Sequence, residues 1–153
     1  GWREVPLRER ATVFYKLREL LHRDLEELSW LISHENGKVI EEARASVLKA
    51  IECVEFGCSL PNLAAGSELQ VSRGVTCRLE YAPVGVVAGV SPFNFPLMVP
   101  LWMLPQAIVG GNAFILKPSD KCLIPFFPPL KSSILKLLPL CWAAAQHERD
   151  LSM

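Results

Sequence analysis

The residues of this chain that could do chemistry gather at the two ends of one uncharged stretch. Residues 91–96 read Ser-Pro-Phe-Asn-Phe-Pro, and residues 116–120 read Leu-Lys-Pro-Ser-Asp. No residue between 82 and 116 carries an ionisable side chain, so this stretch belongs in a protein interior. A primary amide, Asn94, and an ammonium, Lys117, therefore stand at the edges of apolar structure. Polar groups in such places indicate function, because burying them without partners costs several kcal/mol.

These side chains suit a nucleotide and a reacting carbonyl. A lysine ammonium such as Lys117 donates hydrogen bonds to the hydroxyl oxygens of a ribose, and a carboxylate such as Asp120 accepts them. The Asn94 amide suits an oxygen that becomes negative, because a fixed donor there can raise a rate by about 10²–10³. Simpler roles stay open: an Asx turn for Asn94, and a solvated ion pair for Lys117 and Asp120. The Gly-x-Gly-x-x-Gly fingerprint of many dinucleotide sites is absent.

The elements that would position these residues follow from the apolar pattern. Residues 84–90 are wholly apolar and rich in valine, as in a buried parallel strand. Residues 97–109 can form a helix that a Gly-Gly-Asn sequence ends, and residues 113–117 predict the next strand. Ligands collect beyond the carboxyl ends of parallel strands. Residues 91–94 and 117–120 are therefore expected side by side on one edge.

The first half of the chain predicts two amphipathic helices and a hairpin. Apolar residues recur at three- and four-residue steps over 7–32 and again over 40–54. Asn36-Gly37 separates the two helices, and Gly57 is the expected stop of the second. Apolar and polar residues then alternate across 67–82, which indicates a β-hairpin. The predicted fold class is α/β: two helices, a hairpin arm and the first strand–helix–strand unit of a Rossmann-like sheet.

Composition excludes several classes of protein. The chain has 153 residues, 50% of them hydrophobic, and a formal net charge of zero. Without a basic block it has no electrostatic basis for binding nucleic acid. Its five cysteines lack Cys-x-x-Cys spacing and no signal peptide precedes them, so buried, inert, reduced thiols are expected. That expectation favours the cytoplasm, or the mitochondrial matrix in a eukaryote. Because the chain begins at Gly1 without methionine, we expect a fragment.

A membrane-associated segment is the competing interpretation of the uncharged stretch. Residues 82–116 exceed the length that a bilayer span requires, and Gly85-x-x-x-Gly89 resembles a helix-dimer motif. Recurring prolines interrupt the stretch, and so do the polar residues Asn94, Gln106 and Asn112. One continuous helix would lose backbone hydrogen bonds at each proline. We therefore expect no membrane partner.

Residues 83–96 and 100–119 resemble the aldehyde dehydrogenase superfamily. Within it they are most similar to the CoA-acylating methylmalonate-semialdehyde dehydrogenases. Phe93 precedes the asparagine where many relatives have tryptophan, and Pro-Leu-Trp-Met follows at 100–103. The sequence Glu-Asn-Gly-Lys at 35–38 also fits the amino-terminal region of this family.

The resemblance implies a role for each candidate residue. Asn94 would be the side-chain half of the oxyanion hole, and Ser91 and Phe93 would line the cofactor cleft. The adenosine ribose of NAD would meet Lys117 and Asp120, with Lys121 close by. Two positions depart from the family pattern: Asp120 stands where glutamate is usual, and Lys121 where arginine is common. The shorter carboxylate of Asp120 would reach the ribose through water.

The resemblance also implies what the parent enzyme does. It would oxidise methylmalonate or malonate semialdehyde with NAD, pass the acyl group to CoA and assemble as a homo-oligomer. The family's nucleophilic cysteine and its catalytic glutamate lie beyond position 153, so the chain alone is expected to be inactive. Residues 1–121 would be a partial NAD-binding domain. Residues 122–153 would be a divergent tail, either a shifted reading frame or a lineage-specific extension. A non-catalytic interaction fragment that pairs through its hairpin is the remaining alternative.

Overall fold

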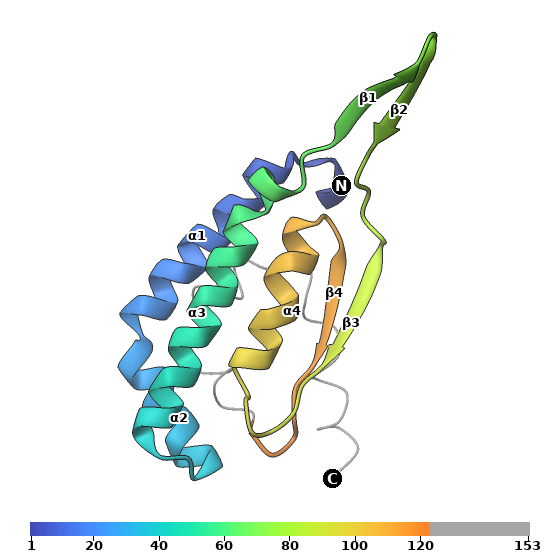
Figure 1. Cartoon of the computed structure of the whole chain (residues 1–153). Coiled ribbons are helices and arrows are strands. Elements are labelled where there is room, and N and C mark those ends of the chain that lie inside the picture. Colours follow the sequence, from blue (N-terminus) through green and yellow to red (C-terminus); the bar gives the residue numbers. More distant parts are fainter. Residues whose placement is uncertain (123–153) are drawn as a thin grey trace.

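The computed structural model describes residues 1–122 of the chain. The predicted tail therefore lies outside the described residues, apart from Cys122. Helices come first, followed by a hairpin and a strand–helix–strand unit, so the predicted α/β fold class is confirmed (Figure 1). The elements are the 3₁₀ helix η1 (Trp2–Glu4), α1 (Leu7–Arg23), α2 (Leu25–Asn36), α3 (Ile40–Leu63), β1 (Ser67–Ser72), β2 (Val75–Leu79), β3 (Val86–Val90), α4 (Met98–Val109) and β4 (Ala113–Lys117).

The first predicted helix is divided in two. Asp24 ends α1 and begins α2, with a backbone that leaves the regular helical conformation. Its carboxylate binds the guanidinium of Arg23, with both nitrogen-to-oxygen distances at 2.7 Å. Aspartate is unfavourable inside a helix and common at its ends, and the apolar stripe continues across the break. At the end of α2, Gly37 adopts a left-handed conformation with φ of 74°, so the predicted break there is confirmed.

The second predicted helix does not stop at Gly57. Helix α3 continues to Leu63, and Gly57 is a buried contact point with α4. A Cβ added at Gly57 would lie 2.5 Å from the Cβ of Pro105, closer than two carbon atoms can approach. The glycine is therefore required by the spacing of the two helices and not by a helix terminus.

Helix α4 lies between α3 and the β3–β4 strands, and it forms the centre of the core (Figure 1). Helix α3 in turn packs against α1 and α2. The buried residues of α4 are Met98, Pro100, Leu101, Leu104, Pro105, Ile108 and Val109. A helix that is apolar on most of its surface needs partners on several sides, and these layers supply them.

Strands β3 and β4 are parallel and joined through α4, as predicted. Val86 pairs with Ala113 at one end, and Val90 pairs with Lys117 at the other. The expectation of a strand buried on both faces is wrong for the described residues. Val86 is 67% exposed and Val90 is 74% exposed, because only one face of the pair packs against α4.

The predicted hairpin within 67–82 is present. Strands β1 and β2 are antiparallel, and every residue of both strands is exposed. Figure 1 shows the hairpin extending away from the helices and from the β3–β4 strands. The alternation of apolar and polar residues thus reports the hairpin, but neither of its faces is covered in the part of the chain that the structure describes.

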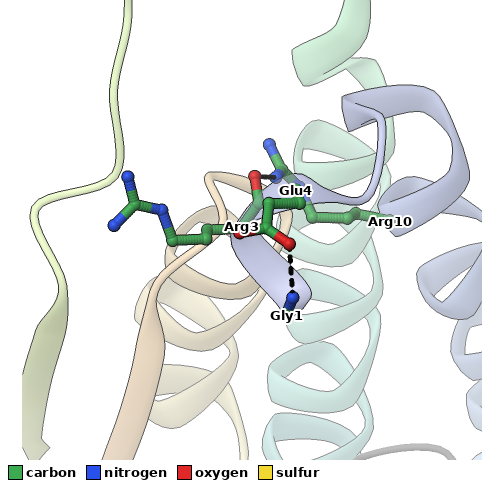
Figure 2. Close-up of polar contacts among 4 residues, drawn as sticks. All are labelled: Gly1, Arg3, Glu4 and Arg10. Atoms are coloured by element: carbon green, nitrogen blue, oxygen red, sulfur yellow. Dashed lines mark hydrogen bonds and ion pairs between the residues drawn. The ribbon is translucent and has the colours of Figure 1, made fainter.

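A buried arginine secures the end of α4 to the amino-terminal segment. Arg10 is 6% exposed, and its Nε donates a hydrogen bond of 2.7 Å to the Val109 carbonyl. Its Nη1 donates one of 3.1 Å to the Arg3 carbonyl (Figure 2). Trp2 Nε1 donates to the Ile108 carbonyl nearby, at 2.8 Å. Burial lowers the pKa of Arg10, but its positive charge suits the negative end of the α4 dipole.

We expect Arg10→Met to lower the free energy of unfolding by about 1.5–3 kcal/mol, the usual worth of hydrogen bonds from a charged group. Chemical denaturation followed by circular dichroism measures this change. The matched control is Arg8→Met on the exposed face of α1, which should change stability by less than about 0.5 kcal/mol. Equal effects of the two substitutions would show that Arg10 does not secure α4.

Candidate functional site

The two motifs that the sequence singled out meet at one edge of the β3–β4 pair. Val90, the last residue of β3, pairs with Lys117, the last residue of β4. The backbone N–H of Ser91 then donates a hydrogen bond of 3.1 Å to the Lys117 carbonyl. The predicted shared edge is therefore confirmed, since the segments that follow the two strands start from bonded neighbours.

A second contact joins the segments beyond the strands. The Lys121 ammonium lies over the Phe93 ring, with its Nζ 5.4 Å from the ring centroid. Phe93 is half exposed, so the interaction is worth about 0.5–1 kcal/mol. The structure thus brings Ser91 together with Lys117, and Phe93 with Lys121.

Three candidate polar side chains at this edge have no partner within the described part of the chain. The Asn94 amide, the Lys117 ammonium and the Asp120 carboxylate are exposed and unpaired there. Neither the Asx turn nor the Lys117–Asp120 ion pair is formed in the described residues, although the sequence left both open. The Ser91 hydroxyl is buried and also lacks a partner. Leaving a buried hydroxyl unpaired costs about 1–3 kcal/mol. Because Ser91 is only 6% exposed, its hydroxyl faces the interior and not the open edge.

Two residues that the sequence reasoning did not select donate hydrogen bonds to the backbone of the turn that contains Asn94. Asn36 Nδ2 donates a hydrogen bond of 2.7 Å to the Phe93 carbonyl. Lys38 Nζ donates one of 2.7 Å to the Asn94 carbonyl. In the sequence argument Asn36 served only as part of a helix break, and Lys38 entered only through the family resemblance. No periodicity links the α2–α3 connection to a turn more than fifty residues later, so spacing alone could not find this contact.

The thiols and imidazoles of the described residues do not form a second site. Burial raises the pKa of the Cys53 and Cys58 thiols, which favours the unreactive protonated form. Cys77 is exposed in β2, so the expectation of a buried thiol is wrong there. Residues 1–122 contain no group of three or more metal-ligating side chains. Cys141 and His147 lie outside the described residues.

None of the helices in the described residues has both the length and the apolar composition that a membrane crossing needs. Within the uncharged stretch, α4 spans only Met98–Val109. The structure divides the rest of the stretch between two strands and the turns beside them.

Comparison with known proteins identifies the family. The model of the aldehyde dehydrogenase family matches residues 1–125. Malonate-semialdehyde dehydrogenase 2 of Geobacillus thermodenitrificans is 47% identical over 121 residues, which are 78% of this chain and 25% of that protein. Malonate-semialdehyde dehydrogenase 1 of Geobacillus kaustophilus is 46% identical over the same length.

Solved structures agree with the sequence relatives. The crystal structure of methylmalonate-semialdehyde dehydrogenase from Oceanimonas doudoroffii matches with a TM-score of 0.76 and 43% identity. The match covers 91% of this chain and 27% of that protein's chain. A methylmalonate-semialdehyde dehydrogenase structure from Sinorhizobium meliloti 1021, complexed with NAD, matches with a TM-score of 0.75 and 38% identity. That match covers 79% of this chain and 25% of the other chain. The chain spans about a quarter of the length of these relatives. By the match over residues 1–125, it belongs to the aldehyde dehydrogenase family.

Proposed function

We propose that this chain is the amino-terminal part of an NAD-dependent, CoA-acylating dehydrogenase of malonate or methylmalonate semialdehyde. The observation that supports the proposal is the shared edge of β3 and β4, where Lys117 ends β4 and Asn94 lies in the turn after β3. Both side chains are exposed and have no partner in the described residues. The similar proteins named malonate-semialdehyde and methylmalonate-semialdehyde dehydrogenase supply the substrate class. In this proposal residues 1–121 are part of the NAD-binding domain.

The residues at this edge suit a dinucleotide. The Lys117 ammonium donates to a ribose hydroxyl and the Asp120 carboxylate accepts from one, and neither has a competing partner in the described residues. The half-exposed Phe93 ring offers an apolar surface, with Lys121 beside it. The unpaired hydroxyl of Ser91 lies buried beneath this edge, at the end of β3. NAD, when bound, supplies the hydride acceptor.

Asn94 acts on the aldehyde in this proposal. Its amide donates a hydrogen bond to the carbonyl oxygen as that oxygen becomes negative, which can contribute about 10²–10³ in rate. The nucleophilic cysteine and the site for CoA belong to parts of the parent enzyme outside this chain. Asp120 is shorter than the usual glutamate, so it reaches the ribose through water and binds it less tightly.

We expect NAD to bind the 153-residue chain weakly and to shift the NMR signals of residues 91–94 and 117–121. Lys117→Met should raise the Kd for NAD about tenfold, because losing one charge-assisted hydrogen bond costs at least about 1.4 kcal/mol. The matched control is Lys16→Met, an exposed lysine of α1, which should leave Kd unchanged. Shifts confined to other residues, or equal Kd values for the two variants, would contradict the assignment of this edge to NAD.

The role of Asn94 can be tested in a chimeric enzyme. In malonate-semialdehyde dehydrogenase 2 of Geobacillus thermodenitrificans, the matching segment is replaced by residues 1–121 of this chain. Asn94→Ala in the chimera should lower kcat by about 10²–10³, because one donor to the oxyanion is lost. NADH formation from aldehyde, NAD and CoA measures this, and the isolated 153-residue chain should produce none. An unchanged kcat would refute the role of Asn94.

A second candidate function, an interaction fragment, is favoured by the exposed hairpin. Five large apolar side chains of β1, β2 and the residues after them are at least half exposed: Leu69, Val71, Val75, Leu79 and Tyr81. An open antiparallel hairpin of this kind can add to another sheet, since its outer strand edges present unpaired backbone groups. Pairing with intact subunits of a homo-oligomer follows from this candidate without any catalysis by the chain.

We expect the tagged chain to co-purify with an intact subunit of the Geobacillus relative if this second function holds. Leu69→Lys should reduce the recovered amount at least tenfold, because burying a leucine contributes about 1.5–3 kcal/mol. Gln70→Lys is the matched control, since it adds the same charge at the neighbouring exposed position of β1. No co-purification at all would remove the interaction candidate and leave the catalytic one.

A further inference from the structure

We propose that Asn36 and Lys38 are positioning residues for the Asn94 amide. This inference rests on the proposed role of Asn94 and adds the groups that fix its direction. Asn36 is the last residue of α2 and Lys38 lies in the short connection to α3, and both are far from Asn94 in the sequence. Neither is proposed to touch the substrate or NAD.

The two side chains bind the carbonyls on either side of the Asn94 α-carbon. Asn36 Nδ2 lies 2.7 Å from the Phe93 oxygen, and Lys38 Nζ lies 2.7 Å from the Asn94 oxygen. Because each peptide unit is planar, one bond orients the plane before the α-carbon and the other orients the plane after it. The two soft backbone dihedrals of Asn94 are then set, and the direction of its Cβ follows from them.

The Lys38 ammonium is held at more than one point. Its Nζ lies 4.0 Å from the centroid of the Phe95 ring, so the ring and the Asn94 carbonyl share it. A hydrogen bond from a charged donor is shorter and stronger than one between neutral groups. Asn36 Nδ2 is also 3.6 Å from Cys122 Sγ, which links the connection to the segment after β4.

The connection is itself firmly placed. Gly37 turns the backbone in the left-handed conformation, and this lets the residues on both sides of it reach the same turn. The helices that flank it are anchored in the core by Leu31, Ile32 and Ala43, all buried. Asn36 and Lys38 therefore bind the Asn94 turn from a well-anchored segment, although the side chains of the turn itself are largely exposed. Such support matters, because a misplacement of about 1 Å can cost roughly 10²-fold in rate.

The first test uses the 153-residue chain and the ¹³C shifts of backbone carbonyls, which report hydrogen bonds that a carbonyl accepts. We expect Lys38→Met to move the Asn94 carbonyl signal upfield, and Asn36→Asp to move the Phe93 signal, each without loss of the folded spectrum. Lys38→Arg should restore the Asn94 signal, since arginine also donates. The control Lys16→Met should move neither. An Asn94 carbonyl signal that is the same in wild type and Lys38→Met would overturn the proposed bond.

The second test measures catalysis in the chimera described above. Lys38→Met should lower kcat roughly 10–100-fold with little change in KM, and Lys38→Arg should recover most of the loss. In the Asn94→Ala background, Lys38→Met should have no further effect, because its influence passes through Asn94. A kcat that falls for Asn94→Ala but not for Lys38→Met would overturn the positioning proposal alone. A kcat unchanged by Asn94→Ala would overturn the proposed function instead.

Discussion

The packing of α4 between α3 and the β3–β4 strands is the constraint on which the rest of this structure depends. The helix approaches α3 so closely at Gly57 that a methyl group would overlap Pro105. On the other side a Cβ at Gly89 would lie 2.6 Å from Phe114 and 2.8 Å from Met103. Overpacking by one methyl group commonly costs about 1–3 kcal/mol. Gly57 therefore lets the apolar helix pack against the helical layers, whereas at Gly89 the contacted atoms are the ends of the Phe114 and Met103 side chains.

The position of α4 also places the candidate site. The turn that carries Asn94 leads directly into the first residues of α4, and Pro96, Leu97 and Met98 are buried there. The far end of the helix is held by Arg10 and Trp2, which bind the carbonyls of Val109 and Ile108. With both ends fixed, β3 and β4 run parallel and finish at the same edge. Buried apolar packing thus determines where the polar side chains at that edge lie.

Both pairs of strands leave apolar surface open in the described residues. The outer face of β3 and β4 exposes Val86, Val90 and Ile115, and the hairpin exposes both of its faces. Parallel strands are usually covered on both faces, and a pair of strands has little stability without a packed partner. Here α4 supplies that partner on one face. The stability of the pair therefore comes from the helix more than from the bonds between the strands.

The sequence by itself determined the local elements and the edge at which chemistry could occur. The break at Gly37, the hairpin within 67–82 and the strand–helix–strand order were readable because turn residues and apolar periodicity act within a few positions. The shared edge of Asn94 and Lys117 followed from the topology of parallel strands. Tertiary contacts decided the rest: where α3 ends, which face of β3 is covered, and how Asn36 and Lys38 hold the turn at Asn94. Those features join residues far apart in the chain, and no local pattern encodes such contacts.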